Sequence, residues 1–159
     1  MSVRKNLALA GELVFEARAK LKTARLLARH ADFAPACFYA QQAAENALKG
    51  VLIALDVPYA RMHHLDQLLE AIPQTDRRAL VPVRDRILEL DKMYLPTRYP
   101  DALGGRAPSK VFTGREAKSA IAVAAQIAAR AARILLRERL KERAATAKSA
   151  GRPAVPRKQ

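Results

Sequence analysis

Residues 36–49 of the chain have the sequence ACFYAQQAAENALK, and this stretch decides the fold. Alanine recurs there every three or four positions, which is the spacing of one helical face. Phe38, Leu48 and Leu52 extend the apolar character to other sides of the same helix. A helix that is apolar on more than one side is usually central in its fold. We therefore expect residues 35–55 to form the central helix. Its main apolar face comprises Ala36, Ala40, Ala43, Ala47 and Val51.

The composition of the whole chain agrees with a helical protein. The 159 residues include 33 Ala and 20 Leu, against 9 Val and 6 Ile. Ala and Leu favour helices, whereas β-branched residues favour strands. A single cysteine, Cys37, excludes a disulfide scaffold. The longest uncharged run, residues 33–44, is shorter than the roughly 20 residues of a membrane span. We find no signal peptide and expect a cytoplasmic protein without membrane contact.

Apolar periodicity and helix-capping residues define the expected elements. Thr113 and Glu116 form a capping box at the start of the last helix. Asp76 is a candidate N-cap for the helix before it. The pattern predicts an all-α, up-and-down bundle of four long helices and one short helix over residues 1–143, followed by a disordered basic tail over residues 144–159. The expected helices cover residues 3–30 or 7–30, 35–55, 64–72, 76–94 and 114–143. Pro82 lies early in the fourth of these, so this helix begins either at residue 76 or near Val81. Its apolar stripe comprises Leu80, Val83, Ile87, Leu90 and Tyr94.

The net charge of +14 indicates anionic partners such as nucleic acid or nucleotides. The excess lies at the two ends of the chain and after Arg98, while the middle is close to neutral. A coding bias towards Arg and Ala explains much of this excess equally well. Charge alone therefore leaves the partner open.

Two further stretches complete a recognisable pattern. Residues 62–69 are MHHLDQLL, and residues 94–101 are YLPTRYPD. Together with AQQAAENALK at 40–49, they resemble the HEPN domain, the helical partner of small nucleotidyltransferases in prokaryotes. The resemblance covers about residues 7–135. One position departs from the family pattern, because His64 replaces the acid that follows the family histidine.

The resemblance implies a bundle of about five helices that usually dimerises. Members of the family act as toxins paired with nucleotidyltransferase antitoxins, as ribonucleases, or as modules that bind nucleotides or RNA. The ribonucleases carry an Arg followed, after four to six residues, by a His. Here Leu103, Gly104 and Gly105 follow Arg98 at that spacing, and no histidine occurs after His64. We therefore assign no catalytic residue, and we expect neither a metal nor a cofactor.

The first candidate binding residues lie on the central helix. Gln42, Glu45 and Lys49 share one side of it, and the Glu45–Lys49 spacing suits an ion pair. These residues either stabilise the helix or line a ligand groove. His63 stands at a helix start, where it either caps the helix or faces a ligand. Cys37 is expected to be a small buried residue.

The second candidate site is the segment Arg98-Tyr99-Pro100-Asp101. Two interpretations are open: Arg98 and Asp101 form an ion pair across the turn, or Arg98 binds a phosphate while Tyr99 stacks on a base. Further cations follow nearby at Arg106, Lys110 and Arg115.

Two classes of function follow from these residues. We expect a non-catalytic homodimer that is the partner of a nucleotidyltransferase in a toxin–antitoxin type of module. It would bind nucleotide, RNA or protein through the Arg98 segment. The alternative is a metal-independent ribonuclease toxin with a non-standard active site. A third and weaker possibility is a general nucleic-acid binder that relies on the basic tail.

Overall fold

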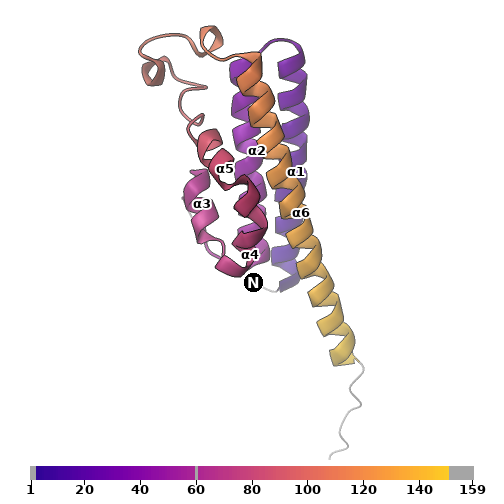
Figure 1. The fold of residues 1–159 in the computed structure, drawn as a ribbon. Coiled ribbons are helices and arrows are strands. Elements are labelled where there is room, and N and C mark those ends of the chain that lie inside the picture. Colours follow the sequence, from indigo (N-terminus) through magenta and orange to yellow (C-terminus); the bar gives the residue numbers. More distant parts are fainter. Residues whose placement is uncertain (1–2, 60, 151–159) are drawn as a thin grey trace, which may run out of the picture.

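The computed structural model describes residues 3–59 and 61–150. Within these residues the chain forms helices and turns without any strand, which confirms the all-α prediction. Three long helices make the body of the molecule: α1 (Val3–Arg29), α2 (Phe33–Ala54) and α6 (Gly114–Ala150). They run up, down and down along one another, with the shorter helices on one side (Figure 1).

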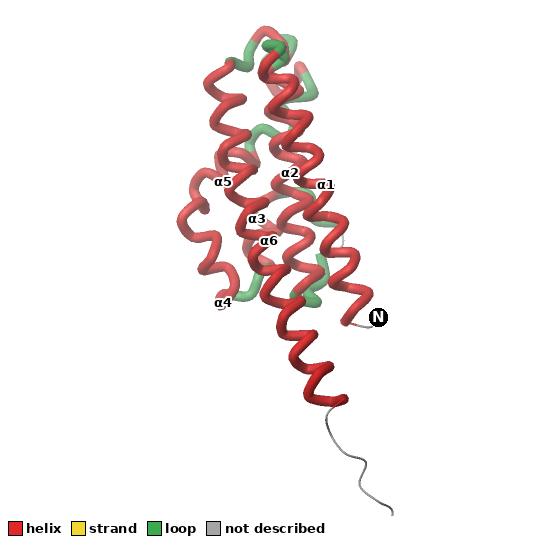
Figure 2. Tube along the Cα trace, turned by 90° about the vertical axis from the view of Figure 1, so that its right-hand side faces the viewer, coloured by secondary structure: helices red, strands yellow, loops and turns green. Residues whose placement is uncertain are grey.

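The long helix α2 occupies the centre, as its all-round apolar pattern predicts. Both α1 and α6 pack against it and also contact each other, and Figure 2 shows the three side by side. Small residues let the helix backbones approach closely. A Cβ added at Gly50 would lie 3.2 Å from the carbonyl oxygen of Ala10, so a side chain there would push α1 away from α2. The fully buried alanines of this contact include Ala10, Ala17, Ala40 and Ala47.

The segment after α2 differs from the expected long helix over residues 76–94. The chain forms α3 (Leu65–Ala71), α4 (Gln74–Arg77), the 3-10 helix η1 (Arg78–Val83) and α5 (Arg84–Asp91). Pro82 explains the division, because it lacks the N–H of an α-helical hydrogen bond and its ring clashes with the preceding turn. Four residues of the predicted apolar stripe are buried all the same, namely Leu80, Val83, Ile87 and Leu90, whereas Tyr94 at its end is only partly buried.

Asp76 does not cap a helix, which corrects the N-cap prediction. It lies within α4, and its carboxylate pairs with Arg137 of α6. A second link joins the same two regions, since Arg130 Nε donates to the carbonyl oxygen of Ala79 at 2.9 Å. These contacts tie the α4–η1 segment to α6.

Turns and two short 3-10 helices, η2 (Pro100–Leu103) and η3 (Pro108–Lys110), lead from α5 to α6. This segment projects at one end of the bundle (Figure 1). The predicted capping box is confirmed where α6 begins. The Thr113 backbone N–H donates to Glu116 Oε2 at 2.8 Å, and the Glu116 N–H donates to Thr113 Oγ1 at 3.4 Å.

The last helix is longer than predicted. We expected it to fray after Arg143, but α6 continues to Ala150, and its end extends past the bundle (Figure 1). Residues 151–159 of the predicted disordered tail lie outside the described residues.

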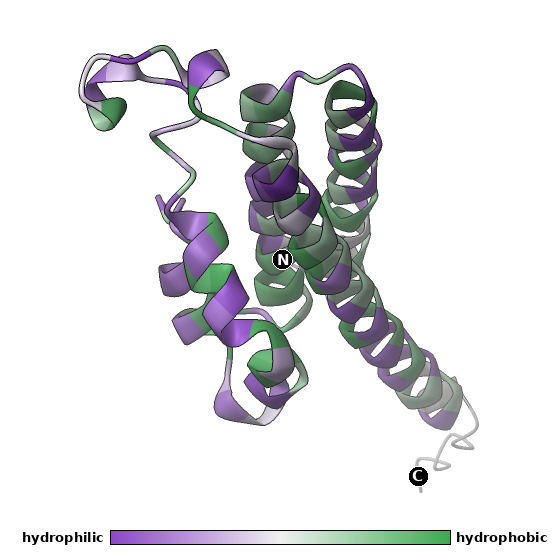
Figure 3. Cartoon of the chain, turned by 45° about the horizontal axis from the view of Figure 1, so that its top comes forward, coloured by the Kyte–Doolittle hydropathy of each residue, from purple (hydrophilic) through white to green (hydrophobic). Residues whose placement is uncertain are grey.

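Both hydrophobic and hydrophilic residues occur along the whole length of α6, as Figure 3 shows. Among the described helices, only α6 has the length and the apolar composition that crossing a membrane requires. Much of its apolar side is, however, buried within the bundle.

Candidate functional site

One side of α2 carries the residues from which the candidate site is built. Phe38, Gln42, Glu45 and Lys49 follow one another at intervals of three or four positions, so they form a single stripe along the helix. The segment before α3 contacts one part of this stripe, and the segment after α5 contacts the other. The stripe therefore joins the two predicted groups of site residues.

Glu45 is the centre of a buried polar network. It is only 5% exposed, and a carboxylate is costly to bury without partners. Gln42 Nε2 donates to it at 3.0 Å and Lys49 Nζ at 2.8 Å, while His63 Nδ1 lies 3.1 Å from the carboxylate. The structure thus brings together four of the predicted residues. The predicted Glu45–Lys49 ion pair is confirmed, but it is largely buried rather than on the surface.

Gln41 belongs to the same network, although sequence analysis did not select it. Its side chain is fully buried, and its Oε1 accepts a hydrogen bond from Gln42 Nε2 at 2.7 Å. Its own Nε2 has no hydrogen-bond partner among the described residues. Two adjacent glutamines inside an alanine-rich helix were the available signal, since amides are rarely placed in an apolar core without a reason.

The two adjacent histidines contact different elements. The backbone at His64 is extended, so successive side chains point in opposite directions. His63 reaches Glu45 on α2, whereas His64 Nδ1 lies 3.3 Å from Asp91 Oδ2 at the end of α5. The alternative that His63 caps α3 is wrong. The helix is capped from another element, because the Leu65 N–H donates to Asp91 Oδ1 at 2.7 Å.

Arg98 lies among three aromatic rings. Its Cζ is 4.3 Å from the ring centroid of Tyr94, 5.1 Å from that of Tyr99 and 5.3 Å from that of Phe38. These distances are typical of cation–π contacts. The Arg98 Nε also donates to the carbonyl oxygen of Tyr94 at 3.1 Å. We call Phe38, Tyr94, Arg98 and Tyr99 the Arg98 cluster.

Arg98 does not pair with Asp101, which was the structural alternative for this segment. Asp101 is exposed on η2, and no ion pair involves Arg98 in the part of the chain that the structure describes. Tyr99 is 49% exposed, so an aromatic residue next to the guanidinium remains accessible. The fork of an arginine matches the oxygens of a phosphate, and an exposed ring can stack on a base.

Folding does not place His63 beside Arg98. The two residues contact different turns of α2, at Glu45 and Phe38, which are about 10 Å apart along the helix axis at about 1.5 Å per residue. His64 is instead the histidine that shares a neighbour with Arg98. Its ring packs edge-on against Tyr94, with the ring centroids 5.6 Å apart.

One group of described residues could hold a metal ion. His64, Asp66 and Asp91 each offer one ligand atom within 4.8 Å of the others. An imidazole with two carboxylates suits Mn²⁺ or Zn²⁺. Both carboxylate oxygens of Asp91 already have partners, however, in Leu65 N–H and His64 Nδ1. Sequence analysis found no metal spacing because Asp91 lies far along the chain from the other two.

Cys37 is fully buried, as predicted. Burial, with a smaller contribution from the negative charge of Glu116, raises the pKa of its thiol to about 12. The thiol is therefore protonated near neutral pH and takes no part in nucleophilic chemistry.

Two aromatic residues of the Arg98 cluster were missed as site residues. The sequence pattern placed Phe38 on an apolar side of the central helix and Tyr94 at the end of the apolar stripe of the expected helix 76–94. Tyr94 stands four positions before Arg98, which is the spacing of neighbours on a helix. The turns after α5 keep that spacing, because the Thr97 N–H donates to the carbonyl oxygen of Met93. The four-residue spacing could therefore have identified Tyr94 as a neighbour of Arg98. Phe38 is far from Arg98 in the sequence, so no local pattern links the two residues.

Comparisons with known proteins identify the family. The HEPN domain model matches residues 10–135. The comparison with curated proteins found no match. TT1696 from Thermus thermophilus is a similar solved structure, with 34% identity and a TM-score of 0.66, and the match covers 79% of this chain and 97% of that one. ST0689, described as an archaeal HEPN homologue, has 29% identity, a TM-score of 0.63 and the same coverage. The chain belongs to the HEPN domain family.

Proposed function

We propose that this HEPN-domain protein is a non-catalytic, cytoplasmic module that binds nucleotide phosphate through the Arg98 cluster. One observation carries the proposal: the Arg98 guanidinium lies among aromatic rings, and none of the described carboxylates pairs with it. A carboxylate partner would compete with a phosphate for the same donors. The rings orient the guanidinium without using its terminal nitrogens, which stay available to a ligand.

The neighbouring cations support an anionic ligand. Arg106, Lys110 and Arg115 are exposed, and none of them forms an ion pair within the described residues. They lie in the segment between α5 and the start of α6, which also carries Arg98. Such cations add long-range attraction for a phosphate without selecting a base.

A free nucleotide and a single-stranded RNA share this chemistry, so the experiment includes both. Calorimetric titration with AMP and fluorescence anisotropy with a 12-nucleotide RNA measure affinity for the wild type, Arg98→Ala and Lys92→Ala. Lys92 is a matched control because it is an exposed cation outside the cluster. We expect Arg98→Ala to weaken binding about tenfold or more, as loss of a charge-assisted contact implies. An equal effect of Lys92→Ala would refute a specific role for Arg98.

A ribonuclease remains the second candidate, because one observation favours it. His64 is held by Asp91 at Nδ1 and packs on the ring of Tyr94, which Arg98 also contacts. A histidine oriented in this way can move a proton near a bound phosphate. Cleavage of a structured RNA should be measured for the wild type, Arg98→Ala, His64→Ala and His63→Ala. We expect no cleavage in any variant. Cleavage that Arg98→Ala and His64→Ala abolish, while His63→Ala retains it, would establish the enzyme instead.

The protein partner is proposed from the family resemblance. We propose that the chain pairs with a small nucleotidyltransferase in a toxin–antitoxin type of module. A neighbouring gene whose product carries the nucleotidyltransferase pattern G-S-x10-D-x-D, together with co-purification of the two products, would support this. Purification of the two co-expressed proteins as separate species would contradict it.

We also propose a homodimer. The apolar sides of α2 offer no surface to a second copy, because α1, α3 and α6 cover them within one chain. Family resemblance is the remaining support. Light scattering should give twice the chain mass of 17.5 kDa at micromolar concentration, and a mass of one chain would contradict the proposal.

A further inference from the structure

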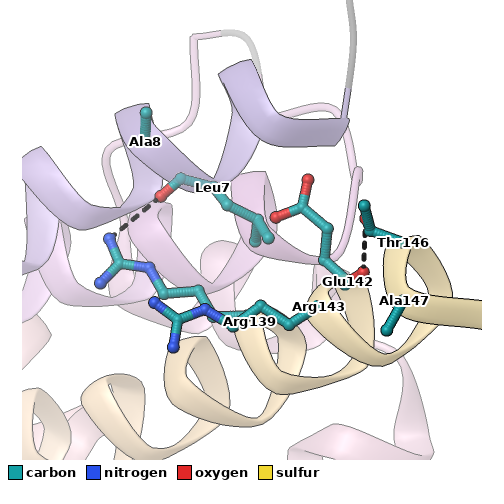
Figure 4. Close-up of a pocket in the computed structure, with 7 residues that line it drawn as sticks. All are labelled: Leu7, Ala8, Arg139, Glu142, Arg143, Thr146 and Ala147. Carbon is teal, nitrogen blue, oxygen red and sulfur yellow. Dashed lines mark hydrogen bonds between the residues drawn. The ribbon is translucent and has the colours of Figure 1, made fainter. Parts of the chain in front are cut away.

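Three hollows lie one after another between the outer faces of α1 and α6, with volumes of about 610, 540 and 620 Å³. We call this row of hollows, between residues 7–29 of α1 and 114–147 of α6, the α1–α6 seam. Figure 4 shows the last hollow, where Arg139, Glu142 and Arg143 of α6 face Leu7 of α1. Arg139 Nη2 donates there to the carbonyl oxygen of Leu7 at 3.4 Å.

The seam has an apolar floor that no described element covers. The first hollow is floored by small or apolar side chains, among them Phe33, Ile121 and Ala122. The middle hollow includes Phe15, which is 68% exposed, and Leu136, which is 58% exposed. Large apolar side chains at such exposure, gathered along the seam, are typical of a protein interaction site.

The borders of the seam are strongly cationic. Two glutamates, Glu12 and Glu142, also line the hollows. None of the cations forms an ion pair with any residue that the structure describes. All the charged residues that line the first hollow are cations. The six cations of the seam are Arg18, Arg25, Arg29, Lys118, Arg139 and Arg143.

We propose that the α1–α6 seam binds an amphipathic helix of a partner protein, with acidic residues on both sides of its apolar stripe. The apolar stripe would cover the floor, and the acidic flanks would meet the arginines and Lys118. The alanines of the floor allow a helix backbone to approach closely. From Leu7 to Arg29, α1 rises about 33 Å, so a partner helix of about 20 residues fits the length of the seam.

Charge argues against other occupants. A second copy of this chain would place the same six cations opposite one another, which like-charge repulsion opposes. The end of this chain, residues 151–159, carries three basic residues and no acidic one, so it does not complement the seam either. Nucleic acid would satisfy the cations but would leave Phe15 and Leu136 without an apolar partner.

The test uses a designed peptide as the probe. A fluorescent 21-residue helical peptide carries Leu on one stripe and Glu on both flanks. A second peptide has Lys in place of Glu, and a third has the sequence of the first in scrambled order. Anisotropy at physiological salt should show binding of the first peptide only. Equal binding of the scrambled peptide would show that the cations attract any negatively charged peptide, whether or not it has an apolar stripe. This result would overturn the proposal.

Matched variants locate the binding surface. Ala122 lies in the first hollow, while Ser119 is an exposed small residue of the same helix that lines none of the three hollows and lies off the stripe of α6 residues that line them. We expect Ala122→Glu to weaken peptide binding about tenfold or more and Ser119→Glu to change it less than about twofold, since each tenfold corresponds to about 1.4 kcal/mol. Arg98→Ala should leave peptide binding unchanged, which separates this proposal from the proposed nucleotide site.

Three other outcomes would overturn the proposal. If Ala122→Glu converts a dimer to a monomer in light scattering, the seam is an interface between two copies of the chain. If a 12-nucleotide RNA displaces the peptide, and Ala122→Glu weakens RNA binding as much as peptide binding, the seam binds nucleic acid. Peptide binding that Ala122→Glu leaves as intact as Ser119→Glu does would place the peptide elsewhere and would equally refute it.

Discussion

Replacing Glu45 with Gln should destabilise the protein much more than an ordinary surface change. The substitution keeps the shape of the side chain but removes the charge that Lys49 and His63 contact. Breaking a buried ion pair by removing one partner costs about 3–5 kcal/mol. The Lys49 side chain keeps 15% of its exposure and so some contact with water. We therefore expect a loss near the lower end, about 3 kcal/mol.

Urea unfolding followed by circular dichroism measures this loss. At a slope of about 2 kcal/mol per molar urea, the midpoint should fall by about 1.5 M. Glu16→Gln is a matched control, because Glu16 and Lys20 form the same i,i+4 pair at 3.1 Å with side chains that are 52% and 23% exposed. It should cost less than about 0.5 kcal/mol. A similar shift for the two variants would show that burial of the Glu45 network contributes nothing to stability.

Four further predictions concern Cys37, the start of α6 and the end of the chain. Because the pKa of the Cys37 thiol is raised to about 12 from 9.0, iodoacetamide at pH 8 should modify the unfolded chain and not the native protein. For the same reason, the thiol contributes to stability below pH 9.0 and loses this contribution as the pH rises towards 12, so thermal unfolding should shift to lower temperature over that range. Thr113→Ala removes the N-cap of α6 and should cost about 1 kcal/mol in urea unfolding, against a smaller loss for Thr146→Ala inside the helix. Truncation after Arg143 removes four basic residues and should keep the fold while it reduces the salt dependence of polyanion binding; an unchanged salt slope would contradict this.

Local sequence signals were enough to predict most of the fold. The alanine periodicity of α2 and the Thr113–Glu116 capping box depend on neighbours within a turn or two, and the structure confirms both. Pro82 indicated a later start of the fourth expected helix, near Val81, and α5 begins at Arg84. Its division into α4, η1 and α5 was not predicted, because the buried stripe from Leu80 to Leu90 continues through Pro82 with helical spacing. The length of α6 was underestimated, since residues 144–159 were expected to form a disordered basic tail, whereas the alanine-rich residues 144–150 continue the helix.

The candidate site was only partly predictable, because its contacts join distant segments. Gln42, Glu45 and Lys49 share a helical face, so spacing alone brought them together. That His63 reaches Glu45, and that His64 reaches Asp91, depends on how the chain packs back on α2 and α5. The ring of Phe38 beside Arg98 depends on the same long-range contact. No periodicity within one helix encodes such pairs.

The preference for AMP over adenosine tests the central claim most directly, because these two ligands differ only in the phosphate that Arg98 is proposed to hold. Calorimetric titrations of the wild type and Arg98→Ala with each ligand give this preference as a ratio of affinities. We predict that the wild type prefers AMP by about tenfold or more, as charge-assisted hydrogen bonds to a phosphate imply. Arg98→Ala should lose most of this preference while it retains the weaker affinity for adenosine. The same ratio in the wild type and in Arg98→Ala would contradict phosphate recognition by the Arg98 cluster.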